Sequence, residues 1–525
     1  MKNKFTFIDL FSGIGGFKLA LSNNGGECIN FSEINKDAVN SYCENHNENS
    51  ESNLGDITKI KKLPKHDILT AGVPCQSWSI AGKNLGFDDD RGQLWNDTIY
   101  LLKQSQPKAF IFENVKGLVD PRNRKSFSYI LDRIKQAGYF AKYYVINSFD
   151  YGVPQNRIRV YIVGFKEKKH LDNFKLPKPF ENRIKLADIL GIKLPTAKEK
   201  SIIQKDLFGN PILAKQMSLS SKNGFNDYFL FNDLRNGQTT IHSWDILETS
   251  ERQKKICLLL LKNRRKSQFG KLDGNPLSLK HFKGLDASIS KKEISKLVDL
   301  DILKEEEYQF KINDFEESEL TENELELLSK ESNANLLTDD LKTHRPLKIK
   351  NISIKDTLES LKEKGVVECT EIRYDFKNTK ISSGLFGVNR VFLPTSDVFP
   401  TLVASDTNDY VTLSSLRTDN HETYRQDFLD KVYFSDNYRK ITKEEACVIQ
   451  GFPKDFKLPE SRARWMKLIG NSVSVSVIDM LAKTIIETEV FDERKNITER
   501  IKKHEMPTIA VVNKGSGYNN KVQTL

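Results

Sequence analysis

The first 165 residues alternate short apolar runs with polar stretches that have a helical pattern. The apolar runs occupy residues 5–11, 28–34, 67–73, 109–115, 141–149 and 159–165. The helix-like stretches between them include residues 35–47, 94–105 and 126–137. Alternating strands and helices predict an α/β fold with a mostly parallel, doubly wound sheet. Ligands of such sheets bind at the carboxyl ends of the strands.

This alternation stops after about residue 166, and a compact pattern returns near residue 438. We therefore predict four parts along the chain, which are a first domain at 1–166, an inserted domain at 167–400, a return to the first domain at 401–485 and a polar C-terminal tail at 486–525. The return contains a helix capped by Thr442, with Glu445 completing a capping box. A loop and a long helix follow within residues 462–487.

Within the inserted domain, residues 249–314 suggest a winged-helix-like subdomain. Two amphipathic patterns, at 250–266 and 290–303, predict helices, and residues 307–312 predict a wing strand. Because an α-helix fills the major groove, such a subdomain suits DNA readout. An ordinary small helical subdomain explains the same pattern without any function.

Composition limits the class of protein. The chain has 525 residues, and no run approaches about 18 consecutive apolar residues, so we expect no membrane span. The N-terminal apolar run is broken early by Asp9, which predicts a first strand and not a signal peptide. The six cysteines form no CxxC pair and have no histidine at metal-ligand spacing, which argues against a metal site and for a reducing cytosol.

The net charge of +10 suits a polyanionic partner such as DNA. A lysine- and asparagine-rich chain from an AT-rich genome explains this charge equally well. Charge alone therefore does not identify the partner.

A glycine-rich turn, DLFSGIGGF at 9–17, follows the first strand. Glycines there let the backbone approach a ligand, and the next helix offers free N–H groups. Lys18 occupies a position where the dinucleotide fingerprint needs a small residue, so a pyrophosphate is not specifically indicated. Glu33 ends the second strand, where it could bind ribose hydroxyls, and Asp56 could accept a bond from an adenine amino group. The turn therefore predicts a nucleoside site.

Chemically unusual residues also follow three later strands. Cys75 lies in a polar turn stiffened by Pro74, although a lone cysteine is more often a small buried hydrophobe. Glu113 ends an apolar strand, where desolvation should disfavour its ionisation. Arg157 and Arg159 begin the last strand and share a face by alternation, as a simple surface row of charges also would.

Together these motifs closely resemble the DNA (cytosine-5)-methyltransferase family of bacterial restriction–modification systems. The matching segments are DLFSGIGGF (9–17), GVPCQSWS (72–79), FENV (112–115), QNRIRVYIVG (155–164), EEACVIQGFP (444–453) and GNSV (470–473). They occur in the family's order and spacing and cover about 1–166 and 395–485. The resemblance implies a Rossmann-like, S-adenosylmethionine-dependent methyltransferase sheet, with the insert acting as a target-recognition domain.

The resemblance also implies a role for each motif residue. Cys75 would attack carbon 6 of cytosine, and Glu113 would hold the ring near N3. Arg159 would contact the base carbonyl, with Arg157 supporting the pocket. The implied cofactor-binding residues are Asp9, Phe11, Gly13, Gly15, Gly16, Glu33, Asp56, Pro74, Asn471 and Val473. The implied DNA-binding residues are Gln76, Ser79 and Thr401, of which Thr401 resembles a phosphate-contacting threonine.

The implied function is methylation of carbon 5 of a flipped-out cytosine within a specific short double-stranded DNA sequence, with S-adenosylmethionine as donor and no metal. We expect a monomer in the bacterial cytosol, with a cognate restriction endonuclease acting independently and no membrane partner.

The same residues argue against other functions. A nicotinamide oxidoreductase is disfavoured by Lys18 and by a PCQ turn that has no part in hydride transfer. The intact Cys75, Glu113 and Arg159 argue against a non-catalytic DNA-binding paralogue. The large 167–395 insert favours DNA over tRNA as the substrate, and the chain lacks the Pro-Pro-aromatic turn of amino-group methyltransferases.

Overall fold

The chain folds into two compact units in the computed structural model. Unit 1 contains Met1–Asp227, Leu393–Thr407 and Arg439–Leu525, and unit 2 contains Tyr228–Phe392 and Asn408–Tyr438. The described residues are 5–74, 90–181, 184–194, 204–205, 211–212, 227–270, 274–329, 348–349, 352–379, 384–416, 420–492 and 509–511.

A seven-stranded sheet forms the centre of unit 1, with the strand order β2-β1-β3-β4-β7-β5-β20. Its strands are β1 (Phe5–Leu10), β2 (Gly26–Ser32), β3 (Ile68–Gly72), β4 (Ala109–Val115), β5 (Phe140–Asn147), β7 (Ile158–Phe165) and β20 (Ile509–Val511). Neighbouring strands are parallel except β7, which is antiparallel to both β4 and β5. The predicted α/β class and mostly parallel sheet are therefore confirmed.

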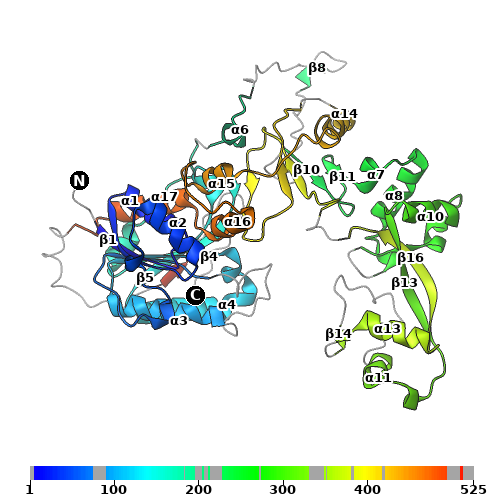
Figure 1. The fold of residues 1–525 in the computed structure, drawn as a ribbon, viewed down its shortest axis with the longest axis horizontal. Helices are drawn as coiled ribbons and strands as arrows, with labels where there is room; N and C mark the ends of the chain where they lie inside the picture. The colour runs from blue at the N-terminus through cyan, green and yellow to red at the C-terminus, as the bar shows by residue number, and fades with distance from the viewer. Residues whose placement is uncertain are drawn as a thin grey trace. The chain divides into compact units, whose positions relative to one another are not determined.

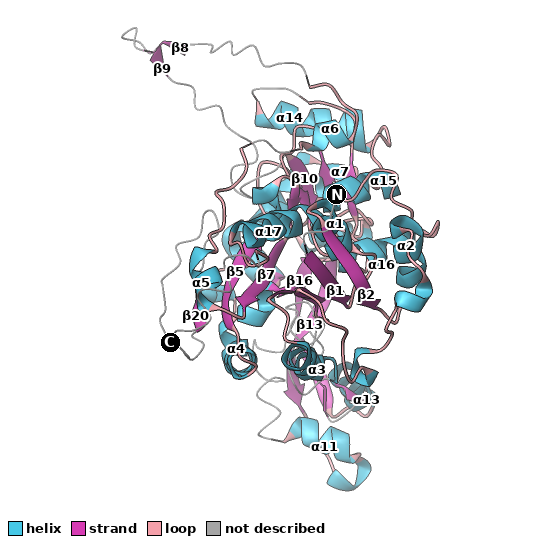
Figure 2. Ribbon diagram, turned by 90° about the vertical axis from the view of Figure 1, so that its left-hand side faces the viewer, coloured by secondary structure: helices cyan, strands magenta, loops and turns pink. Residues whose placement is uncertain are grey.

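Helices cover both faces of this sheet. The described helices of unit 1 are α1 (Gly16–Asn23), α2 (Lys36–His46), α3 (Asp90–Ser105), α4 (Arg124–Gln136), α5 (Lys168–Asn173), α6 (Leu186–Ile189), α15 (Lys443–Gln450), α16 (Arg462–Asn471) and α17 (Val475–Glu487). Figures 1 and 2 show α3 and α4 on one side of the sheet and α1 and α17 on the other. Trp95 and Ile99 from α3 and Ile130 and Ile134 from α4 are fully or almost fully buried in one core with strand residues. The apolar face of each helix thus explains why it packs on the sheet.

Residues of the C-terminal part complete the first domain. The Thr442–Glu445 capping box is present at the start of α15, as predicted. Helix α17 packs against α1, and Asn24 Nδ2 donates to Asp479 Oδ1 at 2.8 Å. Among the described residues, one stretch, Arg462–Glu487, is long and apolar enough to cross a membrane by composition, but 72% of that window is buried inside the protein. It contains α16 and α17, and this burial is typical of core helices.

Short two-residue strands complete unit 1. They are β6 (Gln155–Asn156), β8 (Gln204–Lys205), β9 (Pro211–Ile212) and β18 (Phe399–Pro400), of which β6 pairs with β18 and β8 with β9. The pairing of β6 with β18 brings the segment after residue 393 back to the central sheet just before β7 begins.

Unit 2 contains three further sheets, of which the smallest pairs β14 with β15, and a group of helices. The two larger sheets have the orders β11-β10-β17-β19 and β12-β16-β13. The strands are β10 (Tyr228–Phe231), β11 (Thr240–Ile241), β12 (Leu277–Ser278), β13 (Leu303–Ile312), β14 (Lys348–Ile349), β15 (Ile352–Ser353), β16 (Val367–Phe376), β17 (Arg390–Phe392) and β19 (Asp409–Val411). The helices are α7 (Ser243–Ile246), α8 (Glu251–Asn263), α9 (Leu279–Leu285), α10 (Lys291–Asp299), α11 (Glu322–Leu328), α13 (Ile354–Glu363) and α14 (His421–Phe428).

The boundaries of unit 2 differ from those of the predicted 167–400 insert. Unit 1 extends beyond residue 166 to Asp227, and within that stretch α5 packs against β5 and β7. Unit 2 resumes at Asn408 because β19 pairs with β17, and the ring of Phe428 stacks on that of Phe229 at 3.8 Å. The predicted 486–525 tail also contains β20, which adds an edge strand to the central sheet beside β5. That pairing is a tertiary contact that polar composition does not reveal.

Candidate active site

The carboxyl ends of β1, β2, β3 and β4 share one edge of the central sheet, because these four strands are parallel. The start of β7 lies at the same edge, because β7 runs antiparallel to β4. Residues 9–15, 33, 73–74, 113 and 157–159 are therefore brought to one edge by topology. Most of the sequence-predicted site residues fall in these segments.

Glu113 and Arg159 form an ion pair at this edge. Arg159 Nε lies 3.1 Å from Glu113 Oε1, and their side chains are 14% and 11% exposed. In the antiparallel register Glu113 is opposite Tyr161, two residues beyond Arg159, so these side chains share one face. Burial raises the pKa of the Glu113 carboxyl, while the charges of Arg159 and Arg157 oppose that rise. The site thus holds a carboxyl group that keeps its proton more readily than an exposed glutamate.

Arg157 takes a different position from Arg159. Its side chain is 2% exposed, and its guanidinium donates to three backbone carbonyls. The acceptors and their distances are Leu402 O at 3.0 Å, Gly470 O at 3.1 Å and Ser472 O at 2.7 Å. Arg157 therefore ties the start of β7 to two segments that return from the far part of the chain.

The segment leading to Cys75 is fixed by the residue after Glu113. Asn114 is buried, and its Nδ2 donates to Val73 O at 3.1 Å, which links the ends of β3 and β4. Pro74 is half-buried directly after this link. The predicted site residues Cys75, Gln76 and Ser79 lie outside the described residues.

The glycine-rich turn after β1 adopts left-handed backbone conformations. The φ angles of Phe11, Gly13 and Gly15 are 51°, 56° and 86°. Gly16 needs its small size for another reason, because a Cβ there would lie 2.7 Å from Val473 Cγ2. The turn at 11–16 and the 471–473 segment are thus packed together, as a shared cofactor-binding role requires.

Glu33 acts on the same turn. Its carboxylate accepts from the backbone N–H groups of Gly13, Ile34 and Asn35, at 2.9, 2.8 and 2.8 Å. Glu33 Oε2 accepts only one of these three bonds, so it retains capacity for a ligand hydroxyl. The half-buried Glu33 therefore orders the glycine turn and still suits a ribose.

Asp56 and Asp9, two further predicted cofactor residues, differ in exposure. Asp56 caps a short 3₁₀ turn, accepting from Thr58 N at 3.0 Å and Thr58 Oγ1 at 2.8 Å, and these bonds lower its pKa. Asp9 is fully buried and accepts from Thr70 Oγ1 at 2.8 Å. Burial raises the pKa of Asp9 to about 7. The structure thus places Asp56 near solvent and Asp9 inside the sheet.

Besides Val473, two predicted residues of the returning segment lie at different places. Thr401 Oγ1 donates to Asn156 O, next to the parallel pairing of β18 with β6. Asn471, the last residue of α16, is exposed. Thr401 is therefore engaged with the segment before β7, whereas Asn471 remains accessible.

Two glutamines that the sequence pattern did not single out join these segments. Gln155 and Gln450 are both fully buried. Gln155 Nε2 donates to Ile449 O at 3.0 Å and to Gln450 Oε1 at 2.8 Å, and Gln450 Nε2 donates to Ser472 O at 2.8 Å. Gln155 lies in the motif QNRIRVYIVG and Gln450 in EEACVIQGFP. Their place in these motifs is the only feature of the sequence that could have pointed to them.

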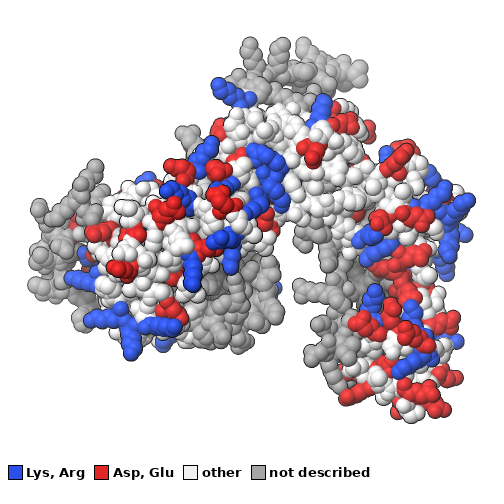
Figure 3. All heavy atoms as spheres, in the orientation of Figure 1, with Lys and Arg blue, Asp and Glu red and all other residues white. Residues whose placement is uncertain are grey.

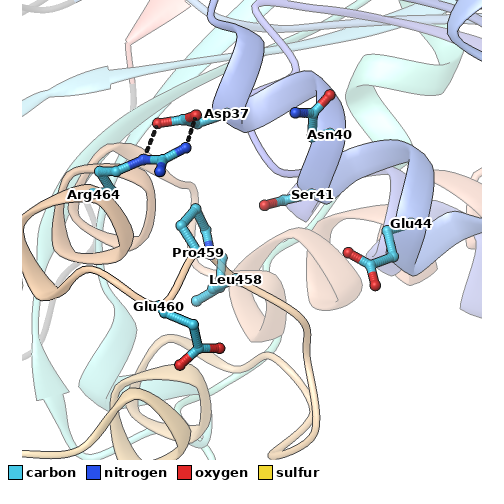
Figure 4. A pocket seen from close by; sticks show the side chains of 8 residues that line it. All are labelled: Asp37, Asn40, Ser41, Glu44, Leu458, Pro459, Glu460 and Arg464. Atoms are coloured by element: carbon cyan, nitrogen blue, oxygen red, sulfur yellow. Dashed lines mark hydrogen bonds and ion pairs between the residues drawn. The ribbon is translucent and has the colours of Figure 1, made fainter.

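A separate surface pocket in unit 1 lies between α2 and the segment before α16 (Figure 4). It is lined by Asp37, Asn40, Ser41, Glu44, Leu458, Pro459, Glu460 and Arg464. Arg464 is paired with Asp37 across it. None of the sequence-predicted site residues lines this pocket, so it is distinct from the edge of the sheet described above.

No group of three or more potential metal ligands occurs within the described ranges. The described cysteines Cys28, Cys43, Cys257, Cys369 and Cys447 are free thiols. What the described part of the site offers is a cationic arginine, a buried carboxyl and a backbone turn suited to a nucleoside.

Comparison with known proteins identifies similar chains. Residues 5–487 match a family described as C-5 cytosine-specific DNA methylase. Type II methyltransferase M.HgiBI from Herpetosiphon aurantiacus is 40% identical over 493 residues, which cover 93% of this chain and 98% of that relative. Type II methyltransferase M.NlaIV from Neisseria lactamica is 31% identical over 516 residues, which cover 92% and 99%.

Proposed function

The chain belongs to the C-5 cytosine-specific DNA methylase family, so it methylates carbon 5 of cytosine in DNA, and we propose that Cys75, Glu113 and Arg159 carry out this reaction. The family assignment confirms the resemblance and the enzyme class predicted from the sequence. The observation that carries the residue assignment is the buried Glu113–Arg159 pair, which lies at the strand edge from which the Cys75 turn departs.

Cys75 is the nucleophile in this proposal. Its thiolate adds to carbon 6 of the cytosine and forms a carbon–sulfur bond, which makes carbon 5 electron-rich enough to accept a methyl group. Loss of the proton from carbon 5 then breaks the carbon–sulfur bond and restores the aromatic ring. Because carbon 6 is stacked inside a duplex, the base first leaves the helix.

Glu113 supplies the acid in the addition step. As carbon 6 is attacked, negative charge develops at N3, and a protonated carboxyl beside N3 neutralises it. The raised pKa of Glu113 favours that protonated form. Arg159, whose guanidinium is paired with Glu113, donates to the carbonyl oxygen of the base. Arg157 supports the pocket through its hydrogen bonds to three backbone carbonyls of the returning segments.

The glycine turn and its partners hold the cofactor, S-adenosylmethionine, which when bound supplies the electrophilic methyl group. The left-handed backbone at Phe11 and Gly13, the spare capacity of Glu33 and the contact of Gly16 with Val473 support this assignment. Asp56, Gly15, Pro74 and the exposed Asn471 belong to the same proposed site. Asp9 supports it from inside the sheet.

The biological role is inferred from relatives that match nearly the whole chain. Relatives named Type II methyltransferases span nearly all of this chain, which supports a modification role in a restriction–modification system. We place the enzyme in the bacterial cytosol as a monomer on double-stranded DNA, beside an independently acting endonuclease. In this proposal Gln76, Ser79 and Thr401 contact the DNA, the insert recognises the target sequence, and no metal takes part.

Covalent trapping tests the proposed nucleophile. A duplex containing 5-fluorocytosine cannot lose fluorine from carbon 5, so the enzyme should remain joined to the DNA after denaturing electrophoresis. Cys75→Ser should give no adduct and no methyl transfer while still binding S-adenosylmethionine in a calorimeter. Cys43→Ser, a matched change on helix α2, should leave the adduct intact. An adduct formed by Cys75→Ser, or its absence with the unchanged protein, would refute the assignment.

A further inference from the structure

Part of unit 2 has the element order of a winged helix. Along the chain, α8 is followed by β12, α9, α10, β13 and β16, and the sheet order is β12-β16-β13. The return strand β16 lies outside the 249–314 range predicted from the sequence, because residues 313–366 separate it from β13. Strands β13 and β16 pair antiparallel along their whole lengths and form a two-stranded ribbon, seen in Figure 1.

These elements share one hydrophobic core. Ile256 and Leu260 from α8, Phe282 from α9 and Ile294 and Leu297 from α10 are fully buried together with strand residues. A common core of this kind fixes the helices relative to one another. The α8–α10 group is therefore a structured subdomain with a defined outer face.

The turn between α9 and α10 is held from the start of α8. Arg252 donates to Glu293 Oε1 at 2.9 Å, Asp286 Oδ2 at 3.0 Å and Ser288 Oγ at 2.9 Å. Ser290 caps α10 with Glu293 in a capping box. The two helices thus keep a fixed crossing, as a helix-turn-helix requires to present its second helix.

The outer face of α9 and α10 is basic. Five lysines on these two helices are exposed, and none has an ion pair among the described residues. They are Lys280, Lys283, Lys291, Lys292 and Lys296. Lys292 and Lys296 are four residues apart, on the side of α10 opposite the buried Ile294 and Leu297. Figure 3 shows basic side chains gathered over the α10 region of unit 2.

At the other end of the ribbon Lys311 and Lys355 are exposed, but two other lysines are neutralised. Lys362 lies 2.7 Å from Glu307, and Lys364 lies 2.7 Å from Glu324. The exposed residues between 313 and 322 are mainly acidic, with Asp314, Glu316, Glu317, Glu319 and Glu322 among them. Five of the subdomain's exposed lysines without an ion pair therefore lie on α9 and α10, away from the acidic insertion in the wing.

We propose that this winged-helix subdomain binds duplex DNA, with the Lys292–Lys296 face of α10 entering the major groove. An α-helix fits that groove, and unpaired lysines match its phosphate walls. The half-buried Ser295 and the exposed Asp299 lie beside these lysines on α10, and both side-chain types can contact base edges. This inference rests on the proposed function only in taking double-stranded DNA as the substrate, and it adds a contact surface outside unit 1.

Salt-dependent binding tests the surface. The full chain and its Lys292→Gln/Lys296→Gln variant are titrated with a labelled, short random-sequence duplex at several potassium chloride concentrations. Each lost phosphate contact lowers the slope of log K against log salt by about 0.9, so the variant should lose about 2 units of slope and bind more weakly. Lys311→Gln/Lys355→Gln removes two exposed lysines from the ribbon end and should leave the slope unchanged.

Two further readouts separate this proposal from the catalytic one. The Lys292→Gln/Lys296→Gln variant should keep its thermal unfolding temperature and, at saturating DNA, its covalent adduct with 5-fluorocytosine. An unchanged slope would overturn the α10 surface even if the enzyme methylates normally. Equal loss in the Lys311→Gln/Lys355→Gln control would also overturn it, because the effect would then be one of general charge. Loss of the adduct in the unchanged protein would instead refute the proposed catalytic residues.

Discussion

Replacing Arg157 by lysine should unfold unit 1 at a distinctly lower temperature. Arg157 is 2% exposed, and its planar guanidinium serves three carbonyls, on Leu402, Gly470 and Ser472. A lysine ammonium at the end of a single chain can reach one of these carbonyls in the same space. Ser472 O also accepts from Gln450 Nε2. When the ammonium bonds to Ser472 O, the buried Leu402 O and Gly470 O therefore both lose their donor.

The expected cost follows from those two acceptors. A buried polar group left without its partner costs about 1–3 kcal/mol, so R157K should lose roughly 2–6 kcal/mol of unfolding free energy. For a unit of this size each kcal/mol corresponds to about 2–4 °C, which gives a fall on the order of 10 °C. Because the carbonyls belong to the 402 and 470–472 segments, those segments should loosen first.

Differential scanning calorimetry measures this fall, and Arg159→Lys is the matched control. Arg159 bonds to a carbonyl only in the adjacent Ile158, and a lysine there keeps a cation beside Glu113. R159K should therefore lower the unfolding temperature less than R157K while reducing methyl transfer more per folded molecule. If R157K unfolds at the same temperature as the unchanged protein, or if R159K unfolds at a lower temperature than R157K, the structural role given to Arg157 is wrong.

Two further predictions concern buried carboxyl groups. Glu113→Gln should slow methyl transfer by about a hundredfold, as is typical for loss of a general acid. Its melting temperature should stay unchanged. A tritiated-methyl assay measures the rate, and a rate equal to that of the unchanged protein would remove Glu113 from the mechanism. Asp9 keeps its proton to about pH 7 in the folded chain, whereas an unperturbed carboxyl ionises near 3.8. The folded state therefore binds more protons between these values, and stability should fall as pH rises through them. Asp9→Asn should flatten that decline in urea midpoints, and an identical pH profile would contradict the burial argument.

Much of the fold could be predicted from local pattern. The six strands and the three helices predicted at 35–47, 94–105 and 126–137 occur within a few residues of those positions, and the capping box at Thr442 is present. These features depend on neighbours along the chain, because burial on one face imposes a period of two or 3.6 residues. Glu113 was likewise identifiable, since a carboxyl group at the end of an apolar strand is unusual.

The roles of the two arginines could not be predicted in the same way. Arg157 and Arg159 share one local pattern, yet Arg159 pairs with Glu113 and Arg157 bonds to carbonyls 245 to 315 positions away. The wing of the α8–α10 subdomain was also incomplete in the sequence, because β16 follows a long insertion. Both outcomes depend on residues that are distant along the chain.

The sequence by itself determined which segments become strands, which turns carry glycine, cysteine or carboxylate, and which family the motifs resemble. Only the tertiary structure decided that β7 runs antiparallel beside β4, and this places the start of β7 at the carboxyl end of β4. A strand has the same side-chain alternation in either direction, so its pattern does not record its orientation. Orientation is set by the packing of the whole sheet, and that packing brings Arg159 to Glu113.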